Sequence, residues 1–127
     1  MTEESPHKSN PGLERVGRAL AYSLQGLRAA YRNESAFRQE IFLALVLIPV
    51  ACVLPVALTQ KALLISCVLI VLVIELVNSA VEATVDRISL DHHEFSKRAK
   101  DVGSAAVLLS LINCLLVWVL VLIEVFG

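Results

Sequence analysis

Three carboxylates and one carboxamide recur at helical spacing between residues 75 and 87 (ELVNSAVEATVDR). Asn78, Glu82 and Asp86 follow Glu75 by 3, 7 and 11 residues. At about 100° per residue, these offsets place all four side chains on one narrow stripe of an α-helix. Carboxylates on such a stripe can act as a general base, bind a divalent cation or carry protons. The stripe is the candidate functional site.

Glu75 is a charged residue inside a long apolar segment. Residues 62–81 form a run of 20 residues in which Glu75 is the single charged side chain, and this length is enough to cross a membrane. A carboxylate inside a bilayer costs roughly 2.5 kcal/mol or more on insertion scales, so protein or water must cover it. We therefore expect Glu75 to face other helices or a wet cavity.

The composition predicts an all-α membrane protein. Hydrophobic residues make up 57% of the chain and charged residues 18%, with a mean hydropathy of +0.72, which is too apolar for an ordinary soluble domain. The charges lie in two blocks separated by apolar runs, so nucleic acid is not expected as a partner. Cys52, Cys67 and Cys114 lie inside apolar runs without metal-ligand spacing, and we interpret them as small apolar residues outside any disulfide.

The first residues divide into a tail and an amphipathic helix. Residues 1–12 are polar and contain two prolines, which predicts a disordered tail. Residues 13–32 carry apolar side chains at intervals of three and four, with basic side chains on other faces. Such a helix suits a membrane surface, and packing of the same stripe on the protein itself remains open. Residues 13–127 are expected to form a single membrane domain.

Three further helices are expected to span the membrane, over residues of about 36–57, 60–87 and 101–125. Residues 41–58 and 102–123 contain no charge, and both runs approach or reach the length needed for ~30 Å of hydrocarbon. Pro49 predicts a kink and Pro55 a helix end, because proline removes a backbone donor and clashes with the preceding turn. A hydrophilic connection over residues 88–101 is expected before the last span.

The distribution of basic residues predicts the orientation. Ten of the eleven lysines and arginines lie before Ile41 or between Arg87 and Lys100, and Lys61 lies in the other turn. Basic loops stay in the cytoplasm, so the N-terminus and the Glu82 end of the stripe are expected there, where ATP is found. Small residues at 103–106 would allow close helix contact, and we expect a homo-oligomer that helps to cover Glu75.

Phosphoryl transfer fits carboxylates that face both lipid and cytosol. That chemistry requires a group that orients the attacking hydroxyl, magnesium on the phosphates, and cations against the developing charge. Glu75 could meet a lipid hydroxyl, while Glu82 and Glu34 are hard oxygen ligands suited to magnesium. Arg15 and Lys100 could bind phosphate. No P-loop or protein-kinase signature occurs in the sequence, so spacing alone leaves this as one interpretation among several.

The segments at residues 26–40 (GLRAAYRNESAFRQE), 75–87 and 98–109 (RAKDVGSAAVLL) resemble the prokaryotic integral-membrane diacylglycerol kinase family. The similarity extends from about Leu13 to Val125, with three motifs in the same order. The resemblance implies a homotrimer in the bacterial inner membrane, each subunit having a surface helix and three transmembrane helices. It also implies transfer of the γ-phosphate of MgATP to diacylglycerol, giving phosphatidic acid, at composite sites between subunits.

The resemblance also assigns roles to residues. It makes Glu75 the general base supported by Asn78, and Glu34 and Glu82 the metal ligands. Nucleotide contacts, in addition to those two ligands, would come from Arg15, Tyr22, Asp91, His92, His93, Lys100 and Asp101. Contacts with the lipid substrate, besides Glu75 and Arg15, would come from Ser23, Arg28, Tyr31, Arg38, Gln39 and Ser104. Asp86 is left outside the catalytic set as a solvated or interhelical ion pair.

Two alternatives remain open. An undecaprenol kinase would share the fold and the Glu-x-x-Asn-x-x-x-Glu spacing but would act on a polyprenol. A small oligomeric transporter could use an intramembrane glutamate to carry protons or cations. Such a transporter would need Glu75, but it would not need Glu34, Glu82, Lys100 and Asp101 together.

Overall fold

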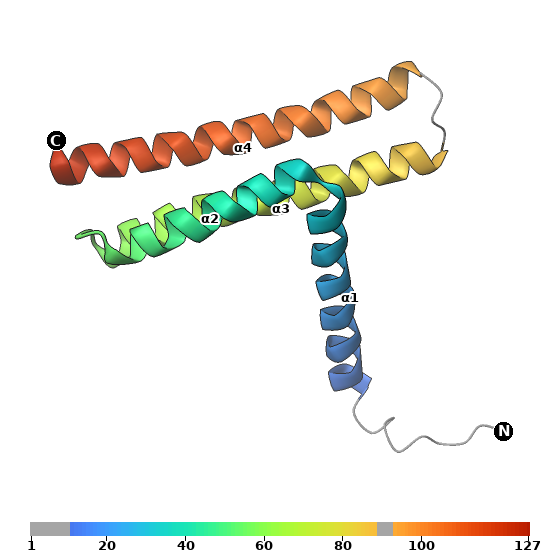
Figure 1. The fold of residues 1–127 in the computed structure, drawn as a ribbon, viewed down its shortest axis with the longest axis horizontal. Helices are drawn as coiled ribbons and strands as arrows, with labels where there is room; N and C mark the ends of the chain where they lie inside the picture. The colour runs from blue at the N-terminus through green and yellow to red at the C-terminus, as the bar shows by residue number, and fades with distance from the viewer. Residues whose placement is uncertain (1–10, 89–92) are drawn as a thin grey trace. The chain divides into compact units, whose positions relative to one another are not determined.

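The computed structural model describes residues 11–88 and 93–127, and within these ranges the regular structure consists of four α-helices, α1 to α4 (Figure 1). The chain divides into two compact units, one ending at Asn33 and the other running from Glu34 to Gly127. Three of the helices are long and apolar enough to cross a membrane. The predicted fold class, an amphipathic helix followed by three membrane helices, is confirmed.

Helix α1, Pro11–Asn33, is the amphipathic helix. It begins with proline, whose missing N–H is not needed in the first turn, two residues earlier than the expected start. It ends at Asn33, one residue beyond the expected end at residue 32. The apolar stripe of α1 is exposed along its whole length; its members are Leu13, Val16, Leu20, Leu24, Leu27 and Tyr31.

Helix α2, Ser35–Val53, contains Pro49 and ends just before Pro55. Leu54 has a ψ of 145°, the extended conformation that a following proline imposes on its neighbour. The helix therefore ends four residues before the predicted limit of 57. Its buried side chains, Phe37, Ala44 and Ala51, are spaced seven residues apart on one face.

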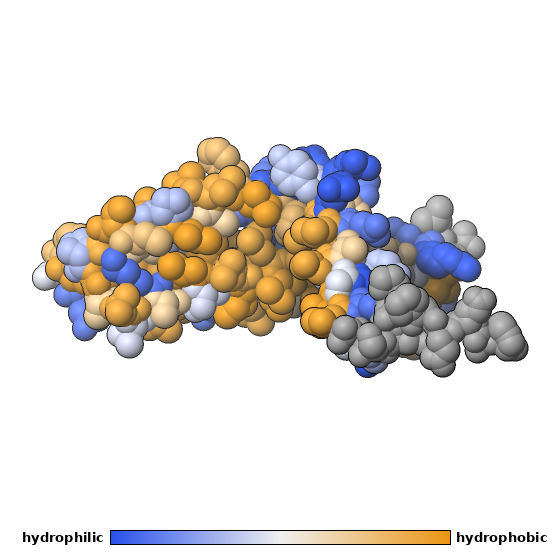
Figure 2. Space-filling model, turned by 90° about the horizontal axis from the view of Figure 1, so that it is seen from below, coloured by the Kyte–Doolittle hydropathy of each residue, from blue (hydrophilic) through white to orange (hydrophobic). Residues whose placement is uncertain are grey.

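Helices α3, Leu58–Ile88, and α4, Glu94–Phe126, contain 31 and 33 residues. At 1.5 Å per residue these lengths correspond to about 46 and 50 Å, which exceeds the ~30 Å of bilayer hydrocarbon. Both helices therefore extend beyond the apolar layer. Hydrophobic residues predominate over the left and central parts of the surface drawn in Figure 2.

The start of α4 corrects the expected connection over residues 88–101. Residues 94–100 are helical, so α4 begins seven residues before the predicted position 101. His93 caps the helix, because its Nδ1 accepts a hydrogen bond of 3.1 Å from the N–H of Phe95, and such a cap satisfies one of the free donors of the first turn. Lys97 and Asp101 form an i, i+4 ion pair of 2.7 Å, which supports the same turn.

Helix α3 is the central element of the second unit, because α2 and α4 each pack against it. The indole Nε1 of Trp118 donates to the carbonyl oxygen of Leu64 at 3.2 Å. One helical turn further along, the sulfur atoms of Cys67 and Cys114 lie 3.5 Å apart. These contacts set an antiparallel register between α3 and α4 (Figure 1). All three cysteines are free thiols, as the sequence predicted.

Candidate active site

The polar stripe continues the buried apolar stripe of α3. Leu64, Cys67, Val68, Val71 and Glu75 are the buried residues of this helix, and their spacing of three and four residues defines one face. Asn78 and Glu82 follow at the same spacing and are half-buried. The face that packs against the neighbouring helices thus changes from apolar to polar at Glu75.

Glu75 is a buried carboxylate with an unfilled hydrogen-bonding capacity. Its side chain is only 5% exposed, and its Oε2 has no hydrogen-bond partner within the described part of the chain. The negative charges of Glu34 and Glu82 act on it electrostatically. Leaving a buried acceptor without a donor costs free energy. This oxygen is therefore well suited to accept a hydrogen bond from the hydroxyl group of a substrate.

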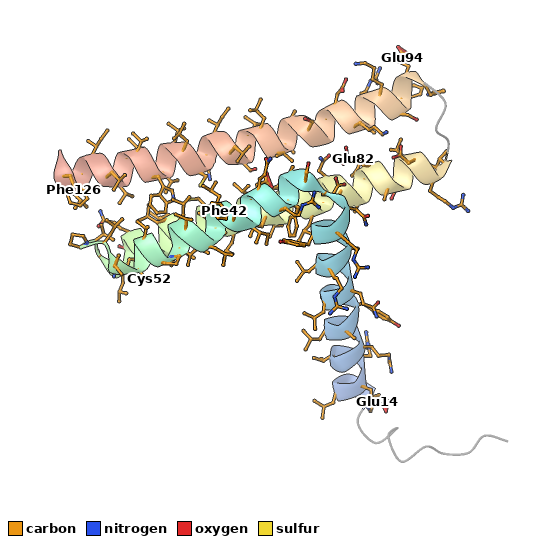
Figure 3. The ribbon with its side chains drawn as sticks, in the orientation of Figure 1. Glu14, Phe42, Cys52, Glu82, Glu94 and Phe126 are labelled. Atoms are coloured by element: carbon orange, nitrogen blue, oxygen red, sulfur yellow. The ribbon has the colours of Figure 1, made fainter. Side chains whose placement is uncertain are left out.

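Glu34 and Glu82, on two different helices, lie near enough to interact electrostatically. Glu34 is the N-cap residue of α2 and is half-buried. Glu82 lies on the half of α3 that leads towards α4 (Figure 3), and the charge of Glu34 acts on it directly. Two carboxylates that repel each other are stabilised by a cation between them. Their oxygens are the hard ligands that Mg²⁺ prefers.

The described residues do not form a complete metal site by themselves. Among residues 11–88 and 93–127, no three His, Cys, Asp or Glu side chains gather into a group that could hold a metal ion. Mg²⁺ usually keeps several waters and binds through one or two carboxylates together with substrate phosphates. The pair formed by Glu34 and Glu82 fits such a shared site.

Asn78 lies between Glu75 and Glu82 on the same face of α3. Its Oδ1 is buried without a hydrogen-bond partner in the described residues. The backbone of Gly103 on α4 lies directly against this oxygen, and a Cβ placed on Gly103 would overlap it. Asn78 is therefore held at the interface between α3 and α4.

Lys100 is joined to the end of the polar stripe. Its Nζ lies 2.7 Å from Oδ1 of Asp86, and Glu82 also acts on it electrostatically. Asp86 is thus an interhelical ion-pair partner, one of the two roles that the sequence suggested for it. Asp101, by contrast, pairs with Lys97 at 2.7 Å, and both of these side chains are exposed.

The remaining predicted contacts are distributed along the surface. His93 serves as the N-cap of α4, while Asp91 and His92 lie outside the described residues. The other predicted contact residues are all exposed. They are Arg15, Tyr22, Ser23, Arg28 and Tyr31 on α1, Arg38 and Gln39 on α2, and Ser104 on α4. Their roles in binding stay predictions.

One residue near the site was missed by the sequence reasoning. Glu40 on α2 is half-buried, its Oε2 is buried without a partner in the described residues, and the negative charge of Glu75 acts on it. The available signal was its position, because Glu40 is the last charge before the apolar run that begins at Ile41. Four glutamates from α2 and α3 therefore share this region.

Comparison with known proteins agrees with the resemblance. The family model for prokaryotic diacylglycerol kinase matches residues 21–122. The chain is similar to the diacylglycerol kinase of Pseudomonas aeruginosa, with 50% identity over 119 residues, covering 94% of this chain and 97% of that protein. The Escherichia coli K12 diacylglycerol kinase is 48% identical over 116 residues, covering 91% and 95% of the two chains. The Haemophilus influenzae one is 50% identical over 107 residues, covering 84% and 91%. This chain belongs to the prokaryotic diacylglycerol kinase family.

Proposed function

We propose that this protein is a multi-pass membrane enzyme that transfers the γ-phosphate of MgATP to the free hydroxyl of diacylglycerol, giving phosphatidic acid. The observation that carries the proposal is the buried Oε2 of Glu75, which has no hydrogen-bond donor among the described residues and lies where the buried face of α3 changes from apolar to polar. A lipid hydroxyl can satisfy this oxygen while the acyl chains stay in the bilayer. Family membership and the names of the similar proteins support the same substrate.

Glu75 is proposed as the general base. In phosphoryl transfer a carboxylate accepts the proton of the attacking hydroxyl and orients its oxygen towards the phosphorus. The hydroxyl oxygen forms the new bond to phosphorus as the bond between phosphorus and the β–γ bridging oxygen breaks, and ADP leaves. Asn78, one turn along the same face, supports Glu75 by fixing the polar surroundings of the carboxylate.

Glu34 and Glu82 are proposed as the protein ligands of the magnesium that accompanies ATP. When bound, the metal supplies positive charge against the phosphate oxygens. Glu34 and Glu82 would hold it at the polar end of the stripe, where the nucleotide would meet it from the aqueous side while the lipid reaches Glu75 from the apolar side. Arg15, Tyr22, Asp91, His92, His93, Lys100 and Asp101 are proposed to contact the nucleotide.

Six exposed residues are proposed to contact the lipid substrate. Ser23, Arg28, Tyr31, Arg38, Gln39 and Ser104 combine hydroxyl, amide, guanidinium and aromatic groups, which suits the glycerol backbone and the boundary between headgroups and acyl chains. The three long helices α2, α3 and α4 all expose much apolar surface. We propose that three copies of the chain associate in the bacterial inner membrane, with the N-terminus in the cytoplasm.

Identification of the product tests the proposal. Purified protein in lipid is supplied with MgATP and either labelled diacylglycerol or labelled undecaprenol, and the phosphorylated lipid is separated and identified. Phosphatidic acid is the expected product. Phosphorylation of undecaprenol alone would identify the polyprenol kinase alternative, and no product from either lipid would contradict kinase activity.

A further inference from the structure

The backbone conformation of α4 does not require a glycine at position 103. Gly103 lies inside a continuous helix of 33 residues, and no glycine of the described chain has a positive φ. Glycine is a poorer helix former than alanine, so its presence here calls for a packing explanation. The half-buried Gly103 faces the interface with α3.

The packing explanation is the carboxamide of Asn78. A Cβ built on Gly103 would overlap Oδ1 of Asn78 and would lie 3.2 Å from its Cγ and 3.9 Å from its Cβ. The oxygen of Asn78 thus fills the volume that any other side chain at position 103 would occupy. The three nearest atoms all belong to the side chain of Asn78, and this residue lies one turn from Glu75.

The surrounding contacts limit how the interface could adapt. On one side of this contact, the sulfur atoms of Cys67 and Cys114 lie 3.5 Å apart, and on the other Lys100 pairs with Asp86. These contacts hold α4 against α3 on both sides of Gly103. A methyl group at position 103 would therefore displace the carboxamide of Asn78 rather than the helix, because packed cores yield first at a flexible side chain.

We propose that Gly103 is a positioning residue for phosphoryl transfer, which acts by leaving space for the carboxamide of Asn78 beside Glu75. The inference rests on the proposed roles of Glu75 and Asn78. Gly103 itself touches neither substrate in this scheme. Its effect reaches the reaction through the placement of one amide group.

A double-mutant cycle tests the inference in the full-length enzyme in lipid. Gly103→Ala should lower kcat by about tenfold to a hundredfold, the range expected when a supporting group is misplaced by about 1 Å, while the affinity for MgATP is retained. In an Asn78→Ala background the overlap is absent, so the same substitution should cause no further loss of kcat and should raise the unfolding temperature. Gly17→Ala is the matched control, because a Cβ at Gly17 meets nothing within 4 Å in the described chain.

The outcomes separate the two proposals. A Gly103→Ala enzyme with unchanged kcat, or one that loses kcat equally in both backgrounds, would overturn the role of Gly103. Full activity of Asn78→Ala alone would instead contradict the proposed role of Asn78 and with it the route by which Gly103 acts. If Gly103→Ala does not fold, the double variant should be recovered in folded form, and failure of both to fold would also overturn the inference.

Discussion

Lys100 Nζ lies 2.7 Å from Oδ1 of Asp86, so an ion pair ties the beginning of α4 to the end of α3. The two side chains are 41% and 45% exposed, and water screens an ion pair this open to solvent, so it contributes little to stability. The ion pair therefore keeps Lys100 near Glu82 but leaves its ammonium group open to exchange. A phosphate group can compete for the same ammonium group.

The ion pair predicts that substitutions of Lys100 and of Asp86 will have different effects on the enzyme. Lys100→Met should weaken MgATP binding markedly, because it removes the cation that is proposed to meet phosphate. Asp86→Asn should leave phosphoryl transfer within about fivefold of the original rate, since only an exposed pair is broken. Steady-state kinetics with varied MgATP provides the measurement, and equal damage from both substitutions would contradict the assignment of Asp86 as a structural partner.

Replacing Glu75 with glutamine should nearly abolish turnover. The amide has almost the same volume but cannot accept a proton, and loss of a general base typically costs about 10²- to 10⁴-fold in rate. MgATP binding, measured by calorimetry, should be retained. Glu124→Gln is the matched control, because Glu124 lies near the C-terminal end of α4 and accepts a hydrogen bond of 2.7 Å from Gln60.

Glu34→Gln and Glu82→Gln should act on the metal–nucleotide complex. Each substitution removes one charged oxygen ligand, so both variants should need more Mg²⁺ for half-maximal activity and should bind MgATP more weakly. Titration of Mg²⁺ at fixed ATP gives the comparison. If Glu75→Gln weakened nucleotide binding as much as these two variants do, the division of roles along α3 would be wrong.

The cysteines should differ in their reactivity towards a thiol reagent. Cys52 is exposed, whereas Cys67 and Cys114 are 2% and 8% exposed at the interface of α3 and α4. In mild detergent, N-ethylmaleimide should therefore modify Cys52 first, and mass spectrometry of peptides gives the extent of labelling. Labelling of all three thiols at the same rate in the folded protein would contradict the packing of α3 against α4.

The helices and the family could be predicted because their signals are local. Charge-free runs, proline positions and the spacing of Glu75, Asn78 and Glu82 all lie within single segments. Family membership also favours an enzyme over the transporter alternative. The start of α4 at Glu94 was missed, because hydropathy marks where a helix becomes apolar and gives no sign of a polar first turn capped by His93.

The contacts between helices could not be predicted in the same way. Nothing in the separate sequences of α3 and α4 indicates that Asn78 meets Gly103 or that Asp86 meets Lys100. The register of a helix pair depends on how many side chains pack together, and several registers satisfy the same apolar pattern. Glu40 was missed for the same reason, since its relation to Glu75 appears only when α2 lies against α3.

Because α3 is longer than the hydrocarbon layer is thick, the depth of its carboxylates depends on the thickness of the bilayer. Lys61, whose Nζ donates to the carbonyl oxygen of Cys52 at 2.6 Å, marks the end of α3 opposite Glu82. From Lys61, Glu75 lies about 21 Å along the helix and Glu82 about 31 Å, at 1.5 Å per residue. With Lys61 at one edge of ~30 Å of hydrocarbon, Glu82 reaches the other edge and Glu75 lies about 10 Å below it. A thinner bilayer brings Glu75 towards the headgroups and a thicker one immerses Glu82, so hydrophobic mismatch sets the hydration of both carboxylates.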